Sequence, residues 1–236
     1  MVSKRVIRDI VERLEPFQGL LEIGPGLGAL TGPLSDKHQL TALEIDPSVM
    51  GALSLAAPKA RVLVQDALTA DISGLLEELP APVGIVSNMP YNITGPLLDR
   101  ILNCRLQIEI AVLMMQKEVA AKIMAEVGSR ARGALSVVMQ ASFQISKVCD
   151  VPPGSFRPPP KVDSTVLQLV PSTSFADDSV VRIVKAGFRN PRKSLVNNLT
   201  ALYSREEASD RVARAGLSPT VRPHQVSWSE WQALAR

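Results

Sequence analysis

Four consecutive residues, Asn88-Met89-Pro90-Tyr91, could align a planar ring that carries an amino group. The amine of such a ring is a poor nucleophile because its lone pair is delocalised, so a catalyst gains by accepting hydrogen bonds from both N–H groups. The Asn88 side-chain oxygen and the Met89 carbonyl are two such acceptors, and Pro90, with no N–H and a fixed φ, can hold that carbonyl outward. Tyr91 offers a flat face to the ring. An ordinary strand-to-helix turn, with Asn88 capping backbone and Tyr91 in the core, explains the tetrapeptide equally well.

The segments around the tetrapeptide predict where it lies. Residues 83–87 form an apolar run that predicts a buried strand directly before it. Pro90 prevents the strand from continuing, while Thr94 and Pro96 suit the cap and the first turn of a helix. The tetrapeptide should therefore lie at the carboxyl end of a strand, which in an open α/β sheet is where ligands bind.

A glycine-rich segment follows an earlier predicted strand, residues 20–23, which itself comes after an amphipathic helix over residues 6–14. Gly24, Gly26 and Gly28 let the backbone approach a ligand and leave free N–H groups at the start of the next helix. Pro33 lies within that helix, so the helix must begin late or be kinked at this residue.

Acidic residues end the next two predicted strands, residues 40–45 and 61–65. Glu44 is placed to accept hydrogen bonds from ribose hydroxyls, whereas Asp46, which precedes Pro47, better suits a helix N-cap. Asp66 could bind the amine of an adenine or cap the next turn, and the residues alone favour the cap.

The glycine spacing favours one cofactor class, because Gly24-x-Gly26-x-Gly28 is not the GxGxxG of dinucleotide-binding proteins. A nucleoside without a pyrophosphate fits it better. S-adenosylmethionine is such a cofactor, and its sulfonium methyl would face an amine held at Asn88 and Tyr91.

Composition limits the remaining possibilities. The 236 residues, 46% of them hydrophobic, can form one large α/β domain or one domain with a small annex. No apolar run approaches the roughly 20 residues of a membrane span, and the N-terminal residues lack signal-peptide features, so we expect a cytoplasmic protein with no membrane partner. Two cysteines and two histidines, without metal-ligand spacing, argue against a disulfide framework or a metal site.

Positive charge is concentrated near the C-terminus. From Thr173 onward ten Lys or Arg residues face six Asp or Glu, and residues 179–205 contain no acid. Arg189, Arg192 and Lys193 belong to this block, which predicts a polyanionic partner, although a solvated helix face is an alternative. A glycine-bounded loop carrying Arg130 and Arg132 could also contact phosphate.

The second half of the chain predicts further elements, followed by a small helical region. Phe156 lies in the proline-rich segment 151–160, a rigid loop that could present its ring to the second face of a base. A buried Phe that anchors the loop is the alternative. The expected elements are a strand at 107–115, helices at 116–126 and 135–143, a strand at 164–170 and a linker at 171–178.

Seven segments together carry a family pattern. They are residues 21–31 (LEIGPGLGALT), 44–46 (EID), 66–68 (DAL), 88–93 (NMPYNI), 115–120 (MQKEVA), 156–164 (FRPPPKVDS) and 189–199 (RNPRKSLVNNL). With this pattern, which spans nearly the whole chain, the protein resembles the ribosomal RNA adenine dimethyltransferases of the KsgA type. Met89 replaces the leucine usual in the family, a change of little consequence because the backbone carbonyl is the group used.

The resemblance implies roles for individual residues. Gly24, Glu44, Asp66 and Asn88 would line the S-adenosylmethionine site, and Asn88, Tyr91 and Phe156 would hold the target adenine. The motif neighbours assigned to the cofactor site are Gly26, Ile45 and Ala67, together with Met1. No metal is required.

The resemblance also implies the fold and the reaction. We expect a class I, Rossmann-like methyltransferase domain over residues 1–172 and a helical RNA-binding domain over residues 173–236, in a monomer. The reaction would be N6,N6-dimethylation of two adjacent adenines in 16S ribosomal RNA of the small subunit or its precursor. Two alternatives are a macrolide-resistance enzyme that methylates large-subunit RNA, against which the motif at 158–164 argues, and an assembly factor for which ribosome binding outweighs catalysis.

The N-terminus differs from the family pattern. Relatives carry a segment ending in Phe-Leu before the first helix, lying across the cofactor, and Met1 stands where that Leu would be. We therefore expect weak cofactor binding unless RNA closes the site. The alternatives are that Met1, Val2 and Ser3 suffice or that the natural start lies further upstream.

Overall fold

The computed structural model describes residues 3–173 and 177–236. By packing, the chain divides into two compact units, which are described separately here. The first comprises Met1–Ala120 and Ile145–Pro171, and the second comprises Ala121–Gln144 and Ser172–Arg236. The domain boundary expected after residue 172 stays a prediction, because compact packing alone does not define an independently folding domain.

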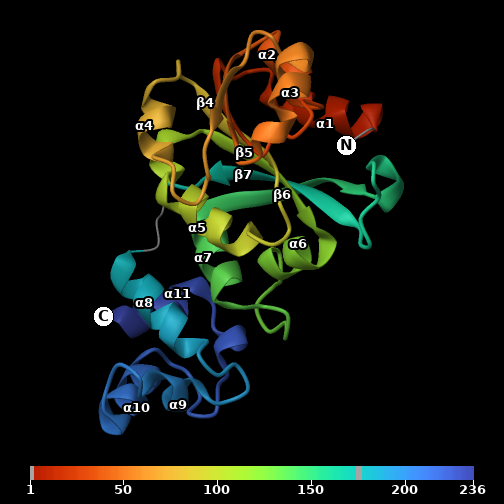
Figure 1. The fold of residues 1–236 in the computed structure, drawn as a ribbon. Coiled ribbons are helices and arrows are strands. Elements are labelled where there is room, and N and C mark those ends of the chain that lie inside the picture. The colour runs from red at the N-terminus through yellow and green to blue at the C-terminus, as the bar shows by residue number, and fades with distance from the viewer. Residues whose placement is uncertain (1–2, 174–176) are drawn as a thin grey trace. The chain divides into compact units, whose positions relative to one another are not determined.

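A seven-stranded sheet with the order β3-β2-β1-β4-β5-β7-β6 forms the framework of the protein (Figure 1). Its strands are β1 (Gly19–Ile23), β2 (Gln39–Glu44), β3 (Arg61–Val64), β4 (Val83–Asn88), β5 (Ile110–Gln116), β6 (Phe143–Val151) and β7 (Ser164–Pro171). The first five strands pair in parallel, and β7 pairs antiparallel with β5. The Rossmann-like α/β fold predicted from the sequence is confirmed.

The strand order reverses between β1 and β4, which are neighbours in the sheet although β2, β3 and their helices lie between them in sequence. At such a reversal the connections leave the two strands in opposite directions, and a crevice opens at their carboxyl ends. Gly24 follows β1 and Met89 follows β4. The two segments with the strongest chemical signals therefore lie side by side.

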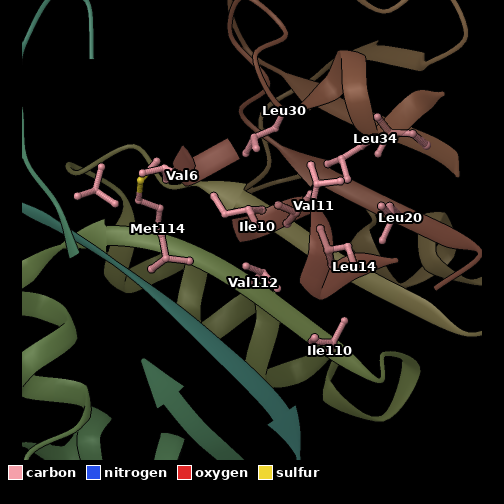
Figure 2. Close-up of a cluster of buried hydrophobic side chains, with 14 residues drawn as sticks. Val6, Ile10, Val11, Leu14, Leu20, Leu30, Leu34, Ile110, Val112 and Met114 are labelled. Carbon is pink, nitrogen blue, oxygen red and sulfur yellow. The ribbon is translucent and has the colours of Figure 1, made fainter. Parts of the chain in front are cut away.

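Helix α1 (Lys4–Leu14) covers one face of this sheet. Its apolar residues recur at helical spacing, so Val6, Ile10 and Leu14 lie on one side of the helix and are buried. They pack with Val112 and Met114 of β5, as Figure 2 shows. Burying this stripe is what orders a helix of only three turns.

Among the other helices of the first unit, the one expected at 116–126 is shorter than predicted and spans Lys117–Ile123. Helix α2 begins late, at Thr31, so Pro33 falls in its first turn without a kink, and Asp46 caps the short turn at Pro47 as predicted. At α5 the cap position is Ile93 rather than Thr94. The helices are α2 (Thr31–Ser35), α3 (Met50–Ala56), α4 (Ile72–Glu77), α5 (Thr94–Asn103) and α6 (Lys117–Ile123), of which α6 ends in the second unit.

The second unit is helical, as the C-terminal sequence predicts. Trp231 and Leu195 are fully buried, and Phe188 lies against Trp231 with ring centroids 5.8 Å apart, so these residues form its core. Leu202 and Trp228, two other large apolar residues of this unit, are only half-buried. Its helices are α7 (Ala134–Ser142), α8 (Asp178–Gly187), α9 (Leu195–Leu199), α10 (Arg205–Arg214) and α11 (Trp228–Ala235).

One strand, β6, was not predicted. Helix α7 ends at Ser142 and the strand starts at Phe143 with no Gly or Pro between them, so the sequence carries no break at this point. The expected strand at 107–115 begins later, at Ile110, after a short 3₁₀ turn (Arg105–Gln107).

Two general features of the described residues concern membranes and metals. No helix in residues 3–173 and 177–236 is long and apolar enough to cross a bilayer. The same residues contain no group of three or more His, Cys, Asp or Glu side chains arranged to hold a metal ion.

Candidate active site

Asn88 and Met89 are held firmly by the sheet while their polar groups stay available. Asn88 is the last residue of β4 and pairs with Met114 of β5, and the Met89 N–H donates to the Met114 carbonyl at 2.9 Å. The Met89 side chain is buried, which anchors the backbone at this point. Within the described residues, no hydrogen bond uses the Asn88 amide or the Met89 carbonyl. Two acceptors therefore project from a rigid strand end.

A cavity of about 340 Å³ opens directly over these groups. It is lined by Asn88, Met89, Pro90 and Tyr91 and by Phe156 with the prolines at 158–160. The structure thus brings together all five residues that the sequence assigned to the target base. The cavity has aromatic side chains from two different loops, which suits a flat ring.

Both aromatic residues also have contacts outside the cavity lining. The Tyr91 hydroxyl forms a 2.6 Å hydrogen bond with the Ser164 hydroxyl at the start of β7. Phe156 is half-buried and packs against the core under α1, so it anchors its loop as well as lining the cavity. The two interpretations of Phe156 are therefore compatible.

The glycine-rich segment adopts a backbone that other residues would resist. Gly24, Gly26 and Gly28 all have positive φ, of 72°, 56° and 83°. A side chain on Gly28 would also collide with Ala56 of α3, at 2.9 Å. A side chain on Gly26 would meet nothing within 4 Å, so the space over Gly26 is open to a ligand.

Glu44 shapes this segment from the end of β2. Its carboxylate accepts the N–H of Gly26 and the N–H of Asp46, each at 2.9 Å. Each carboxylate oxygen keeps a lone-pair direction for a further donor such as a ribose hydroxyl. Ile45, the next residue, is 65% exposed, so its side chain is free to cover a nucleoside ring.

Asp66 acts as a cap and keeps one oxygen available. Its Oδ1 accepts the Leu68 N–H at 2.8 Å after β3, as the residues alone favoured, and Ala67 beside it is buried. The second oxygen of Asp66 makes no hydrogen bond with the described residues. Met1 lies outside the described residues.

Sequence reasoning did not single out Glu22, an acid in the middle of β1. It is 2% exposed, and neither its Oε2 nor the nearby Thr31 hydroxyl has a hydrogen-bond partner among the described residues. Burial raises the pKa of Glu22 to about 7, and the nearby Glu44 charge contributes to the increase. The signal in the sequence was the presence of an acidic residue within the otherwise apolar run 20–23.

Basic side chains gather around a second cavity, of about 560 Å³, within the helical unit. Arg130 lines it together with Arg222 and His224, two residues that sequence reasoning missed because they are isolated in the chain. Burial, and then Arg222 and Arg130, lower the pKa of His224, so this ring is neutral near pH 7 and can accept or donate a hydrogen bond.

Arg132 lies close to Arg130 in sequence but is used differently. It is 5% exposed, and its guanidinium donates to the Ala125 carbonyl and to the Gln140 side chain. These bonds hold the loop before α7 in place. Arg132 therefore has a structural role in this loop and is not exposed to a phosphate, in contrast to what the sequence predicted.

The basic loop of the helical unit, Arg189 to Lys193, is shaped by one buried side chain. Asn198 of α9 accepts the Asn190 N–H at 2.8 Å and donates to the carbonyls of Asn190, Lys193 and Ser194. Arg189, Arg192 and Lys193 are exposed on this loop. Three positive charges are thus presented on an ordered backbone.

Comparison with known proteins adds to this geometry. A model of the ribosomal RNA adenine dimethylase family matches residues 1–233. A protein of Legionella pneumophila (strain Philadelphia 1), "Ribosomal RNA small subunit methyltransferase A", is 37% identical over 245 residues, which cover 99% of this chain and 93% of that protein. A protein of the same name from Xanthomonas axonopodis pv. citri is 39% identical, with 100% of this chain and 92% of that protein covered.

Solved structures match over nearly the whole chain. A dimethyladenosine transferase from Plasmodium falciparum superposes with a TM-score of 0.83 at 22% identity, covering 99% of this chain and 95% of that one. The 23S rRNA methyltransferase ErmE gives a TM-score of 0.72 at 28% identity, covering 99% and 96%.

Proposed function

Because this chain belongs to the ribosomal RNA adenine dimethylase family, we propose that it transfers methyl groups from S-adenosylmethionine to the N6 amine of adenines in small-subunit ribosomal RNA. The observation that carries the proposal is the pair of unused acceptors, the Asn88 amide oxygen and the Met89 carbonyl, beneath a cavity lined by Tyr91 and Phe156. As in the family, the reaction would occur twice on each of two neighbouring adenines.

The glycine-rich crevice fits S-adenosylmethionine on three counts. The space over Gly26 is open, Glu44 can accept from ribose hydroxyls, and exposed Ile45 can cover the adenine ring. Asp66 retains an oxygen for an exocyclic amine. The side chains around the crevice include acids rather than the cations a pyrophosphate would need, and this suits a cofactor with a positive sulfonium. When bound, the cofactor supplies the electrophilic methyl group.

The residues of the chain itself orient the acceptor amine. Asn88 and Met89 would accept its two N–H groups, so that its lone pair is turned toward the methyl donor, and Tyr91 and Phe156 would hold the base flat between them. A side-chain general base is not required, because the amine becomes acidic once it is alkylated and loses its proton to water. Catalysis is then mainly a matter of alignment.

The RNA would bind through phosphates. In the helical unit, exposed Arg189, Arg192 and Lys193 provide one positive surface, and the cavity with Arg130 and Arg222 provides another. Phosphate contacts position a nucleic acid without reading its sequence. Phosphate-binding surfaces together with a cavity for one base suit a folded RNA from which an adenine is splayed out.

The relatives favour the small subunit over the large one. The curated proteins at 34–39% identity carry the name small subunit methyltransferase A, whereas the 23S rRNA methyltransferase ErmE is 28% identical. We further propose that the protein acts as a monomer in the cytoplasm, where ribosomal subunits are assembled.

Methylation of purified subunits tests the proposal. The protein is incubated with methyl-labelled cofactor and with small or large ribosomal subunits that lack adenine dimethylation, and the label is mapped by nuclease digestion. We expect label only in the small subunit, as N6,N6-dimethyladenine at two adjacent positions. Label in the large subunit alone would assign the protein to the other branch of the family.

A further inference from the structure

A hydrogen bond joins Tyr91, which lines the base cavity, to Ser164 at the start of β7. Tyr91 follows β4, whereas Ser164 begins β7, 73 residues later, and their hydroxyl oxygens are 2.6 Å apart. Ser164 is fully buried, and Tyr91 is half-buried beside the cavity. This distance lies within the normal range for an O–H···O hydrogen bond.

Ser164 is a rigid anchor for this bond. It is paired with Gln116 in the antiparallel ladder of β5 and β7, and the Lys117 N–H donates to the adjacent Asp163 carbonyl at 2.9 Å. Phe156 belongs to the connection that ends at Ser164. Ser164 therefore ties the Tyr91 ring to β7, the strand that follows the loop carrying Phe156.

The orientation of the Tyr91 ring depends on few other polar contacts. A tyrosine side chain turns about two torsions, and packing on one half-exposed ring leaves the second torsion comparatively free. A hydrogen bond at the phenol oxygen limits the tilt of the ring edge that lines the cavity. A base that stacks on a tilted ring would present its amine away from Asn88 and Met89, and small errors in alignment lower the rate of transfer steeply.

We propose that Ser164 is a positioning residue for methyl transfer, holding the Tyr91 ring in the orientation that stacks the target adenine over Asn88 and Met89. The inference rests on the proposed function. Its alternative is that the bond only satisfies a buried serine hydroxyl, in which case packing alone orients Tyr91 and catalysis does not depend on Ser164.

Four variants separate these roles in a methylation assay on small subunits. Ser164→Ala and Tyr91→Phe remove opposite ends of the bond, the double variant removes both, and Thr165→Val is a matched control on the same strand. The Thr165 hydroxyl is also buried but donates to Asp150 at 2.8 Å rather than to Tyr91. Melting temperature and cofactor affinity are measured for each variant.

The expected result is a loss of kcat of about tenfold in both single variants, with KM for subunits changed by less than about twofold. The double variant should match either single variant, because both remove the same bond. Thr165→Val should resemble wild type. If Ser164→Ala proves unstable, Ser164→Cys, which fills the same space with only a weak hydrogen-bonding group, replaces it in the comparison.

Nuclear magnetic resonance of the tyrosine rings gives a readout independent of activity. The chain contains only two tyrosines, so the Tyr91 signals can be assigned against Tyr203 of the helical unit. We expect the Tyr91 ring to flip faster in Ser164→Ala than in wild type and Tyr203 to be unchanged. An unchanged flip rate would overturn the positioning role.

The other outcomes are equally decisive. If Tyr91→Phe is slow while Ser164→Ala is normal, the phenol acts on the substrate directly and the proposal is wrong. Normal turnover in both single variants would overturn the proposal and make the bond a purely structural contact. If the losses of the single variants multiply in the double variant, Ser164 and the Tyr91 hydroxyl act independently and the proposal is also wrong. Inactivity of the wild-type protein would instead overturn the proposed function, and the ring-flip comparison would then still decide whether the bond orients Tyr91.

Discussion

Glu22→Gln should stabilise the protein in a pH-dependent manner. The carboxyl group is completely buried in β1 with one unpartnered oxygen, and burial together with Glu44 raises its pKa from 4.5 to about 7. A group whose pKa is raised on folding contributes stability that is fully present below the unfolded pKa, near 4.5, and is lost as the pH rises through about 7.

The size of the effect follows from the shift in pKa. Each pH unit of difference corresponds to about 1.36 kcal/mol, so the wild-type protein should lose about 3 kcal/mol of stability between pH 4.5 and pH 8 through Glu22. Glutamine has nearly the same shape and carries no charge at any pH. The stability of the variant should therefore not include this loss.

Urea unfolding at pH 5 and pH 8, without cofactor or RNA, measures the difference. We expect the free energy of unfolding of the variant, relative to wild type, to be higher at pH 8 than at pH 5 by about 2.5 kcal/mol, because part of the loss already occurs below pH 5. Glu126→Gln, at an exposed position, controls for the loss of an acidic residue as such. If the unfolding free energies of the variant and wild type differ by the same amount at pH 5 and pH 8, the pKa of Glu22 is not raised in the folded protein.

Three further predictions concern ligands. Binding of the cationic cofactor near Glu22 should lower the pKa of this carboxyl group. Wild type should therefore release a proton on cofactor binding near pH 7, and Glu22→Gln should not. Calorimetry in buffers of different ionisation enthalpy measures this proton release. Tyr91→Ala and Phe156→Ala should each weaken productive binding of the target by about 1 to 3 kcal/mol, measured as kcat/KM on small subunits; unchanged values would exclude stacking. Neutralising Arg189, Arg192 and Lys193 together should lower the slope of log affinity for RNA against log salt by about 1 per lost contact. Neutralising the exposed residues Arg8, Lys37 and Lys59 of the first unit should leave this slope unchanged. If the basic-loop variant has the same slope as wild type, the loop is only a solvated surface.

The parallel strands and the helices that cover them were predictable because buried elements have simple signatures. Strands β1, β2 and β4 are apolar runs, and α1 has one apolar stripe, so sequence alone placed them within a residue or two. The residues at the strand ends then followed from topology. Asn88 and Gly24 lie together because β1 and β4 are neighbours in the sheet.

Features that depend on distant partners were not predictable. Nothing in the local sequence distinguishes exposed Arg130 from buried Arg132, whose guanidinium is held by Ala125 and Gln140. The partner of Ser164 lies 73 residues away, and the burial of Glu22 arises from the elements that pack around β1. Such contacts are set by tertiary packing rather than by periodicity or turn chemistry.

The most direct test of the account is single-turnover methylation of small subunits by Asn88→Ala. Removing one of the two acceptors of the amine should lower the rate by at least about 100-fold, the order found when a preorganised hydrogen-bonding group is deleted from an active site. Melting temperature should change little, because the Asn88 amide makes no hydrogen bond within the described residues. Asn92→Ala, an exposed asparagine four residues later, should stay within a few-fold of wild type. A rate for Asn88→Ala within a few-fold of wild type would contradict the assignment of this turn as the active site.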